Sequence, residues 1–344
     1  MKTRLQQSVM GLFLMLMLSC VIAGGAGCGK KPGEKASGQT GKAKQSAAKL
    51  SISINSWIGW APLYLAKAKG LMGDTDLSIA RVEDTGARKS SMIAGHVDGY
   101  ASSVDNFALE SAEGVDGKIV LCFDESSGAD GIVAKRKIKT AKDLKGVKIA
   151  FQKGLPSHFL LLTVLKEAGL SPSDVIQVDM DADKAGAAFA AGQLDAAVTW
   201  EPWISKAAEM ADGGKLVTTR DFPGLIVDTL VFRNEVIQRS AGSVQDVVAG
   251  WFKALSYWRD HQDEADKIMA DAYGLPVAEF KAMCAGVKFY DLPRNKEYFG
   301  SNEKPGPIYS VFASAADLWI ASGIITRKSE SAKEIDSSFI GNMK

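Results

Sequence analysis

Four tryptophans stand at two places in the chain where a small ligand could be held. Trp57 and Trp60 follow one predicted strand, and Trp200 and Trp203 follow another, far along the sequence. Indole rings supply flat apolar walls, and their faces attract cations. We expect some of these four side chains to touch a ligand and the others to pack the rim of its site.

Hydroxyl and imidazole groups stand at similar positions. Ser157 and His158 follow a Gly-containing turn and open a predicted helix. Free N–H groups and the positive end of the helix dipole favour an anionic oxygen there, so both residues are candidate ligand contacts. Ser157 could equally be a simple N-cap, and His158 a polar residue with an internal partner. Ser102 and Ser127, at or just past other strand ends, are weaker candidates.

Carboxylates near the same strand ends favour the opposite ligand charge. Six acidic residues lie near expected strand ends or crossovers: Asp105, Asp124, Glu125, Asp130, Glu201 and Asp228. Of these, Asp105, Glu201 and Asp228 are retained as candidate ligand contacts. Asp130 and Asp228 could instead be hinge or N-cap residues, and Glu201 could bind the backbone of its own turn. Several desolvated carboxylates disfavour an anion, whereas carboxylates beside Trp faces suit an amine or a guanidinium-like cation. A taurine-like zwitterion would use both kinds of group, so the charge of the ligand stays open.

The patterns typical of enzymes and metal sites are absent from the sequence. The only histidines are His96, His158 and His261, and they do not cluster. The segment 179–183 begins like a calcium loop but continues with Lys184 where that loop requires Gly. Beyond the expected export signal, the sequence contains no nucleophile elbow, phosphate loop or dinucleotide fingerprint. We therefore expect no catalytic residue, no cofactor and no metal.

A strand, a turn and a helix recur in two segments that must position these side chains. Leu50–Asn55 alternates like a strand, and Pro62 fits the first turn of a helix over Leu63–Lys69. Val147–Phe151 is a second such strand, and Ser157–Ala168 a second such helix, which Gly169 ends. The same local architecture is therefore predicted twice.

The second half of each unit is similar too. Ser90–Gly99 and Ala187–Ala196 each combine an amphipathic helix, a Gly stop and the start of a buried strand. Strands that alternate with helices predict parallel sheets with helices on both faces. In such sheets ligands bind beyond the carboxyl ends of the strands. This rule selects four segments: Asn55–Trp60, Ser102–Asn106, Gln152–Phe159 and Trp200–Trp203.

Two extended apolar runs divide the chain. Asp130–Lys135 and Gly224–Phe232 look like crossovers between two lobes. We expect residues 49–135 and 225–344 to form lobe I, with residues 136–224 inserted as lobe II.

The first residues are expected to form an export signal. Lys2 and Arg4 precede an apolar stretch, Val9–Ala23, which is shorter than a membrane-spanning helix. Small residues then lead to Cys28, which resembles the acylated cysteine of bacterial lipoproteins; Cys20 is a poorer alternative. We expect a lipoprotein signal peptide over 1–27 and a flexible tether over 28–48, which would hold the protein to a membrane.

The composition is that of an ordinary globular protein. Hydrophobic residues make up 46% of the 344 residues and charged residues 24%, which suffices for two domains. The 41 basic and 40 acidic residues give a formal charge of +1, with no basic stripe that would indicate a nucleic-acid partner. Cys122 and Cys284 lie in apolar settings and are expected to be buried free thiols.

Four segments carry a family resemblance when they are taken in order: Trp60–Gly70, Gly128–Lys135, Asp143–Ala150 and Asp195–Trp203. Through them, about residues 49–340 of the chain resemble the nitrate/sulfonate/taurine-type substrate-binding proteins of ABC importers. It implies the α/β type II periplasmic binding protein fold, with two lobes that are each a mainly parallel sheet flanked by helices. A two-strand hinge would join the lobes and let them close on a ligand.

The resemblance also implies a biological setting. The protein would be a monomeric lipoprotein, held at the periplasmic or extracellular face of a membrane, that delivers a small polar solute to an ABC permease and its ATPase. Such a protein has no catalytic step. The solute is not implied: sulfonates, taurine, nitrate, small amines and guanidines all remain open. A precursor-processing enzyme or a sensor receptor subunit on the same two-lobe fold are the alternatives.

Overall fold

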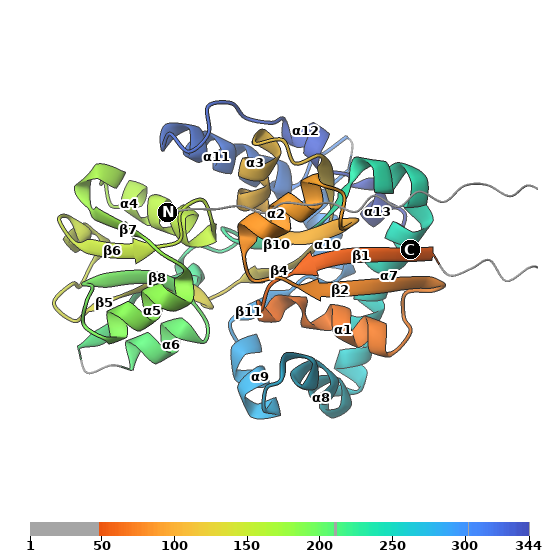
Figure 1. Cartoon of the computed structure of the whole chain (residues 1–344), viewed down its shortest axis with the longest axis horizontal. Helices are drawn as coiled ribbons and strands as arrows, with labels where there is room; N and C mark the ends of the chain where they lie inside the picture. The colour runs from red at the N-terminus through yellow and green to blue at the C-terminus, as the bar shows by residue number, and fades with distance from the viewer. Residues whose placement is uncertain (1–47, 210–211, 302, 344) are drawn as a thin grey trace, which may run out of the picture. The chain divides into compact units, whose positions relative to one another are not determined.

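The computed structural model describes residues 48–209, 212–301 and 303–343, so the expected signal peptide, Cys20 and Cys28 lie outside the described residues. Two β-sheets organise the described chain (Figure 1). The first sheet has six strands in the order β11-β4-β10-β3-β1-β2. Their bounds are β1 (Ala48–Ile54), β2 (Thr75–Arg81), β3 (Gly99–Ser103), β4 (Gly117–Ser126), β10 (Val227–Arg233) and β11 (Val287–Phe289).

The second sheet has five strands in the order β7-β6-β8-β5-β9. Their bounds are β5 (Asp130–Lys135), β6 (Lys148–Phe151), β7 (Ile176–Asp179), β8 (Ala196–Trp200) and β9 (Gly213–Thr218). Three helices belong to this sheet: α4 (Pro156–Glu167), α5 (Ala182–Ala190) and α6 (Trp203–Ala208).

The remaining helices occur in the parts of the chain that connect or follow the strands of the first sheet. Their bounds are α1 (Ala61–Ala68), α2 (Thr85–Ile93), α3 (Val104–Ala112), α7 (Asn234–Asp260), α8 (Gln262–Tyr273), α9 (Val277–Cys284), α10 (Leu292–Phe299), α11 (Pro307–Ala321), α12 (Ser331–Glu334) and α13 (Ser338–Gly341). Helix α1 packs against α7 and α8, and α3 packs against α11.

Both sheets are mixed, so the expectation of mainly parallel sheets was wrong in this detail. Strand β1 pairs in parallel with β2 and β3, and β6 pairs in parallel with β7 and β8. Strand β10 is antiparallel to β3 and β4, and β5 is antiparallel to β8 and β9. Only the strands joined through helices are parallel, because a crossover helix is what returns the chain in the same direction.

The chain passes between the two sheets twice. It runs from β4 to β5 through residues 127–129, and from β9 to β10 through residues 219–226. Strand β5 pairs within the second sheet, so that sheet begins at Asp130 and not at residue 136. The limits of the two lobes otherwise remain a prediction.

The local patterns that the sequence analysis singled out form the expected elements. Pro62 lies in the first turn of α1, and Gly70 follows that helix with a φ of 62° that suits glycine. Helix α4 starts at Pro156 with Leu155 as its N-cap, so the prediction of Ser157 as N-cap was wrong. Proline takes the first helical position because its fixed φ suits the helix there.

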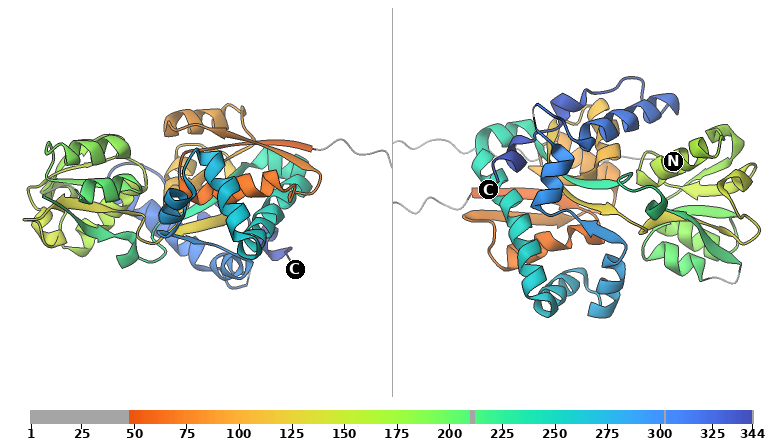
Figure 2. Two further views of the ribbon diagram at one scale, coloured as in Figure 1. Left: turned by 90° about the horizontal axis from the view of Figure 1, so that it is seen from below. Right: turned by 180° about the vertical axis from the view of Figure 1, so that it is seen from behind.

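The inner strands of the second sheet, β5, β6 and β8, are buried on both faces. Along β5, Ile132 and Ala134 belong to one buried cluster with α4, while Val133 belongs to another with α5 and α6. Burial on both faces explains why these strands are mainly apolar, and Figure 2 shows helices on both sides of the sheet. Among the described helices, none is both long and apolar enough to span a bilayer.

Candidate functional site

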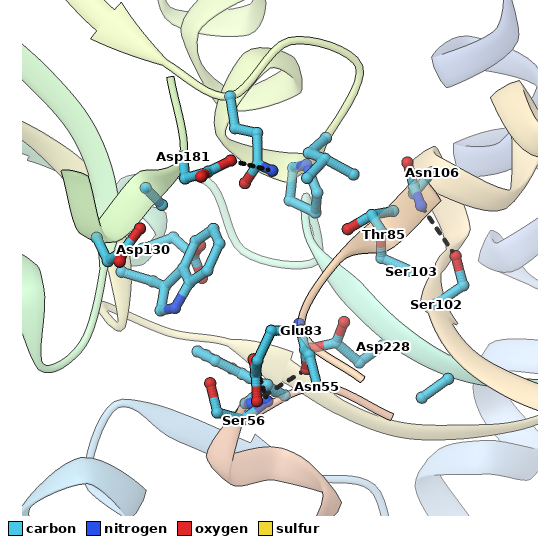
Figure 3. Close-up of a pocket in the computed structure, with 18 of the residues that line it drawn as sticks. Asn55, Ser56, Glu83, Thr85, Ser102, Ser103, Asn106, Asp130, Asp181 and Asp228 are labelled. Carbon is cyan, nitrogen blue, oxygen red and sulfur yellow. Dashed lines mark hydrogen bonds between the residues drawn. The ribbon is translucent and has the colours of Figure 1, made fainter. Parts of the chain in front are cut away.

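A cavity of about 480 Å³ is lined by residues of both sheets (Figure 3). All four segments that the strand-end rule selected contribute to its wall, from Asn55 after β1 to Trp203 after β8. In Figure 3 Asp130 and Asp181 lie on one side, and Thr85, Ser103 and Asn106 on the other. The cavity therefore lies where parallel α/β strands are expected to hold a ligand.

The predicted ligand residues divide into two groups. Those that line the cavity are Trp57, Trp60, Ser102, Trp200, Trp203 and Asp228. Those that are not among its lining residues are Asp105, Ser127, Ser157, His158 and Glu201.

Ser157 and His158 lie behind the start of α4, where Leu155 and Pro156 face the cavity instead. The Ser157 hydroxyl accepts from the backbone N–H of Gln152 at 3.1 Å, which fixes the turn after β6. The His158 ring stacks on Phe151 at 4.7 Å and is only 3% exposed. Burial lowers the pKa of His158 to about 4, with a further contribution from Lys153, so the ring is neutral near pH 7.

Glu201 and Ser127 are engaged by other parts of the protein. The Glu201 carboxylate lies 2.9 Å from the Lys215 ammonium and accepts a 2.6 Å hydrogen bond from the Ser205 hydroxyl. Ser127 lies on the first crossover, where its backbone N–H donates to the carbonyl of Gly286. Both residues therefore have structural partners outside the cavity.

The indole groups from the first sheet are held by internal hydrogen bonds. Trp60 Nε1 donates to Asn55 Oδ1 at 2.7 Å, and Trp57 Nε1 donates to Asp124 Oδ1 at 3.3 Å. Gly59 makes this arrangement possible, because a Cβ there would lie 2.1 Å from Asp124 Oδ2. With their N–H groups committed inward, these rings offer mainly apolar surface to the cavity.

Two lining segments were not predicted from the sequence. One follows β2 and opens α2, with Glu83, Asp84, Thr85 and Arg88; the other follows β7 and opens α5, with Asp181, Ala182, Asp183 and Lys184. Strands β2 and β7 are edge strands that pair in parallel with β1 and β6, so the strand-end rule would have found both segments had these strands been recognised.

Most charges of these two segments already have partners. Asp84 caps α2 by accepting from the Ala87 N–H at 2.6 Å. Lys184 donates to the Asp181 carboxylate. Arg88 is buried and donates to the carbonyl of Val82 at 3.1 Å and to Thr85 Oγ1 at 3.3 Å, while its Nε has no partner.

Four carboxyl groups from four different elements come together beside the cavity. This acidic cluster consists of Asp105 of α3, Asp124 of β4, Asp130 of β5 and Asp228 of β10. Asp130 and Asp228 line the cavity, whereas Asp105 and Asp124 lie behind it and are fully buried. The Ser103 hydroxyl and the backbone N–H groups of Asp105 and Asn106 lie near the Asp105 carboxyl, and Asp124 lies next to Asp228.

Burial controls the ionisation of the acidic cluster. It raises the pKa of Asp105 to about 7, that of Asp124 to about 8 and that of Asp130 to about 7. Burial, followed by repulsion from the Asp124 charge, raises the pKa of Asp228 well above its ordinary value. Glu201 is a further negative group that acts on Asp130. Near pH 7 the cluster is therefore partly protonated.

Two further expectations concern metals and thiols. Within the described ranges no group of three or more His, Cys, Asp or Glu side chains is arranged to hold a metal ion. Cys122 is buried, Cys284 is half-buried, and both are free thiols. Burial raises the pKa of Cys284 to about 12, which keeps it protonated and unreactive.

Comparison with known proteins identifies relatives of this chain. A Bacillus subtilis (strain 168) protein named "Putative aliphatic sulfonates-binding protein" is 30% identical over 268 residues, which cover 75% of this chain and 77% of the relative. A protein of the same name from Escherichia coli (strain K12) is 33% identical over 146 residues, or 41% of this chain. That match spans only 44% of the length of the Escherichia coli protein.

The fold has a solved counterpart. The crystal structure of the periplasmic aliphatic sulphonate binding protein SsuA from Escherichia coli matches with a TM-score of 0.70 at 22% identity, over 84% of this chain and 92% of SsuA. This likeness confirms the expected two-sheet periplasmic binding protein fold. The model of the NMT1-like family matches residues 43–273. The chain therefore belongs to the NMT1-like family.

Proposed function

We propose that this protein is the solute-binding component of an ABC importer and captures a small polar solute in the cavity described above. The observation that carries the proposal is the cavity itself, whose wall combines strand ends of both sheets with four tryptophans. Family membership supports it, as do relatives whose names describe binding of aliphatic sulfonates. On this basis the chain is a binding protein and not an enzyme.

The proposed binding step uses the two crossings between the sheets. Two short connections leave the sheets free to approach each other around a ligand, and a ligand that contacts both would favour the closed arrangement. Closure would exclude water, which strengthens hydrogen bonds and ion pairs inside the cavity. A permease and ATPase would then recognise the closed form and take up the solute.

We further propose a site of action outside the cytoplasm. The export signal and the small residues before Cys28 support a lipid-anchored protein on the periplasmic or extracellular face of a membrane. The tether expected over residues 28–48 would give the folded part reach to its permease.

A thermal-shift screen tests the binding proposal. A solute that binds only the native state raises the melting temperature in a concentration-dependent manner. The panel contains sulfonates, taurine, nitrate, amines, guanidines and pyrimidines. If no solute raises the melting temperature, the proposal fails.

A matched pair of variants tests the location of the site. Trp200 lines the cavity, whereas the neighbouring Glu201 is paired with Lys215. We expect Trp200→Ala to weaken binding of the solute found in the screen about 10-fold or more, as the loss of a buried aromatic contact predicts. Glu201→Ala should change the affinity by less than about threefold. Equal effects of the two changes would contradict the proposed site.

Two measurements separate this proposal from its alternatives. An importer component is required for uptake of its solute, so deletion should abolish uptake in cells with an intact permease, whereas a sensor would leave uptake intact. An enzyme would convert the solute, whereas a binding protein would not. We therefore expect chemical analysis to find the solute unchanged after incubation with the purified protein.

A further inference from the structure

We propose that the ligand of this cavity is a small organic molecule with a net positive charge, whose cationic nitrogen group lies against the carboxylates of Asp130 and Asp228. This inference rests on the proposed function, since it names the class of solute that the binding protein takes. It departs from the aliphatic sulfonates in the names of the relatives.

The two carboxylates are buried and face the cavity without a cation of the protein beside them. Asp130 is 4% exposed and Asp228 is 7% exposed, and both line the cavity. The charged groups that act on them are acidic: Asp105, Asp124 and Asp130 on Asp228, and Glu201 on Asp130. A buried carboxylate without a counter-ion is costly, and the cost is relieved either by a proton or by a cation that enters the cavity.

The acidic residues behind the cavity add to the uncompensated negative charge at this site. Asp105 and Asp124 are fully buried; both act on Asp228, and Asp130 acts on both of them. A neighbouring acid, Glu125, is neutralised by Lys288 at 2.9 Å and by Arg294 at 3.8 Å. The acidic cluster thus differs from its neighbour in lacking any ion pair among the described residues.

The remaining wall adds little positive charge. The lining cations are Arg88 and Lys184, against the further acids Glu83, Asp84, Asp181 and Asp183. Lys184 is already paired with Asp181, and Arg88 is held by Val82 and Thr85. The buried Nε of Arg88 has no partner, but the two cations of the wall are outnumbered by its six acids. A sulfonate without an amine would therefore meet net repulsion.

The aromatic wall indicates an organic cation. Trp57, Trp60, Trp200 and Trp203 surround a cavity of about 480 Å³, which has room for a small organic molecule. Indole faces attract ammonium and guanidinium groups and also cover apolar carbon atoms. A wall that contains both buried carboxylates and indoles fits an amine, amidine or guanidine.

Probes that share a two-carbon chain isolate the effect of charge. Ethylammonium carries only the cation, taurine adds a sulfonate to the same chain, and ethanesulfonate carries only the anion. Methylguanidinium tests a planar cation, and magnesium chloride tests a bare ion. The purified protein is titrated with each at millimolar concentration, with binding followed by calorimetry and by the melting temperature. We expect ethylammonium and methylguanidinium to bind and ethanesulfonate not to bind.

Variants identify the carboxylates responsible. Asp228→Asn and Asp130→Asn should each weaken binding of the cations by about 30-fold or more, because a buried charge partner is removed. Asp183→Asn is the matched control, since Asp183 lines the same cavity but is exposed, and it should weaken binding less than about threefold. Melting temperatures without ligand establish that each variant is folded, and either of the two buried variants suffices for the test.

The outcomes separate this inference from the proposed function. Binding of the organic cations that is lost in Asp228→Asn or Asp130→Asn supports it. If both organic cations fail to bind, or if only taurine, ethanesulfonate or magnesium binds, the inference is overturned. The proposed function falls only if no solute of the wider panel binds. Cation binding that survives in both buried variants also overturns the assignment of the site.

Discussion

Replacing Asp105 by Asn should change stability in a pH-dependent way. Asp105 is fully buried on α3, and Asp130 adds negative charge nearby. Burial raises its pKa from 3.8 to about 7. The folded protein therefore retains a proton that the unfolded chain has lost, and the free energy of unfolding falls as the pH rises from about 4 to about 7.

The size of the effect follows from the raised pKa. A tenfold change in proton affinity corresponds to about 1.4 kcal/mol, so Asp105 alone lowers the free energy of unfolding by about 3 kcal/mol more at pH 8.5 than at pH 5. This is an upper limit, because Asp130 titrates in the same range and shares the effect. An asparagine amide has no charge to desolvate, and its own burial costs the same at both pH values. The free energy of unfolding of Asp105→Asn, relative to that of the wild type, should therefore be about 1–3 kcal/mol higher at pH 8.5 than at pH 5.

Urea unfolding without ligand at the two pH values measures this difference. Asp76→Asn, on an exposed position of β2, is the control and should change the free energy of unfolding by less than about 0.5 kcal/mol at either pH. The reasoning is refuted if the effect of Asp105→Asn is the same at pH 5 and pH 8.5, since the carboxylate would then not be desolvated in the native state.

Three other predictions concern the cavity and the anchor. Affinity for ethylammonium should rise as the pH increases through about 7, because a carboxylate must ionise to pair with the cation. The rise should reach about 10-fold per pH unit below the pKa of the acidic cluster. Calorimetry at several pH values measures the affinity, and an affinity that falls with pH would contradict the prediction. Gly59→Ala places a Cβ 2.1 Å from Asp124 Oδ2 and should cost about 1–3 kcal/mol in urea unfolding. Gly242→Ala, with nothing within 4 Å of the added Cβ, should not destabilise the protein, and equal losses would argue against the crowding at Gly59. Cys28→Ser should release the protein from membranes in a fractionation experiment, whereas Cys20→Ser should not; retention of Cys28→Ser would move the anchor to Cys20.

Local patterns in the sequence were enough to predict the repeated units. Alternation at 50–55, Pro62 and Gly70 define β1 and α1 from nearest-neighbour geometry alone. Because parallel strands place their carboxyl ends at one edge, the same patterns indicated where the cavity would lie. The α/β class and four of the segments at the site could thus be predicted from short-range patterns, whereas the two-lobe periplasmic binding protein fold was expected from the family resemblance.

Individual side-chain roles depended on contacts that the sequence does not reveal. Pro156 and His158 are two positions apart, yet one lines the cavity and the other packs against Phe151, because successive helical residues point in different directions. Trp200 lines the cavity while the adjacent Glu201 pairs with Lys215, a partner on a different strand.

The acidic cluster exists only in the tertiary structure and could not be predicted from local sequence patterns. Asp105, Asp124, Asp130 and Asp228 come from four elements, and each has an ordinary local setting. Their altered ionisation arises only when the pairing of β10 with β3 and β4, and the burial of α3, bring them together away from water. Short-range patterns determine backbone form, whereas desolvation and charge repulsion depend on distances in space, which only the folded chain defines.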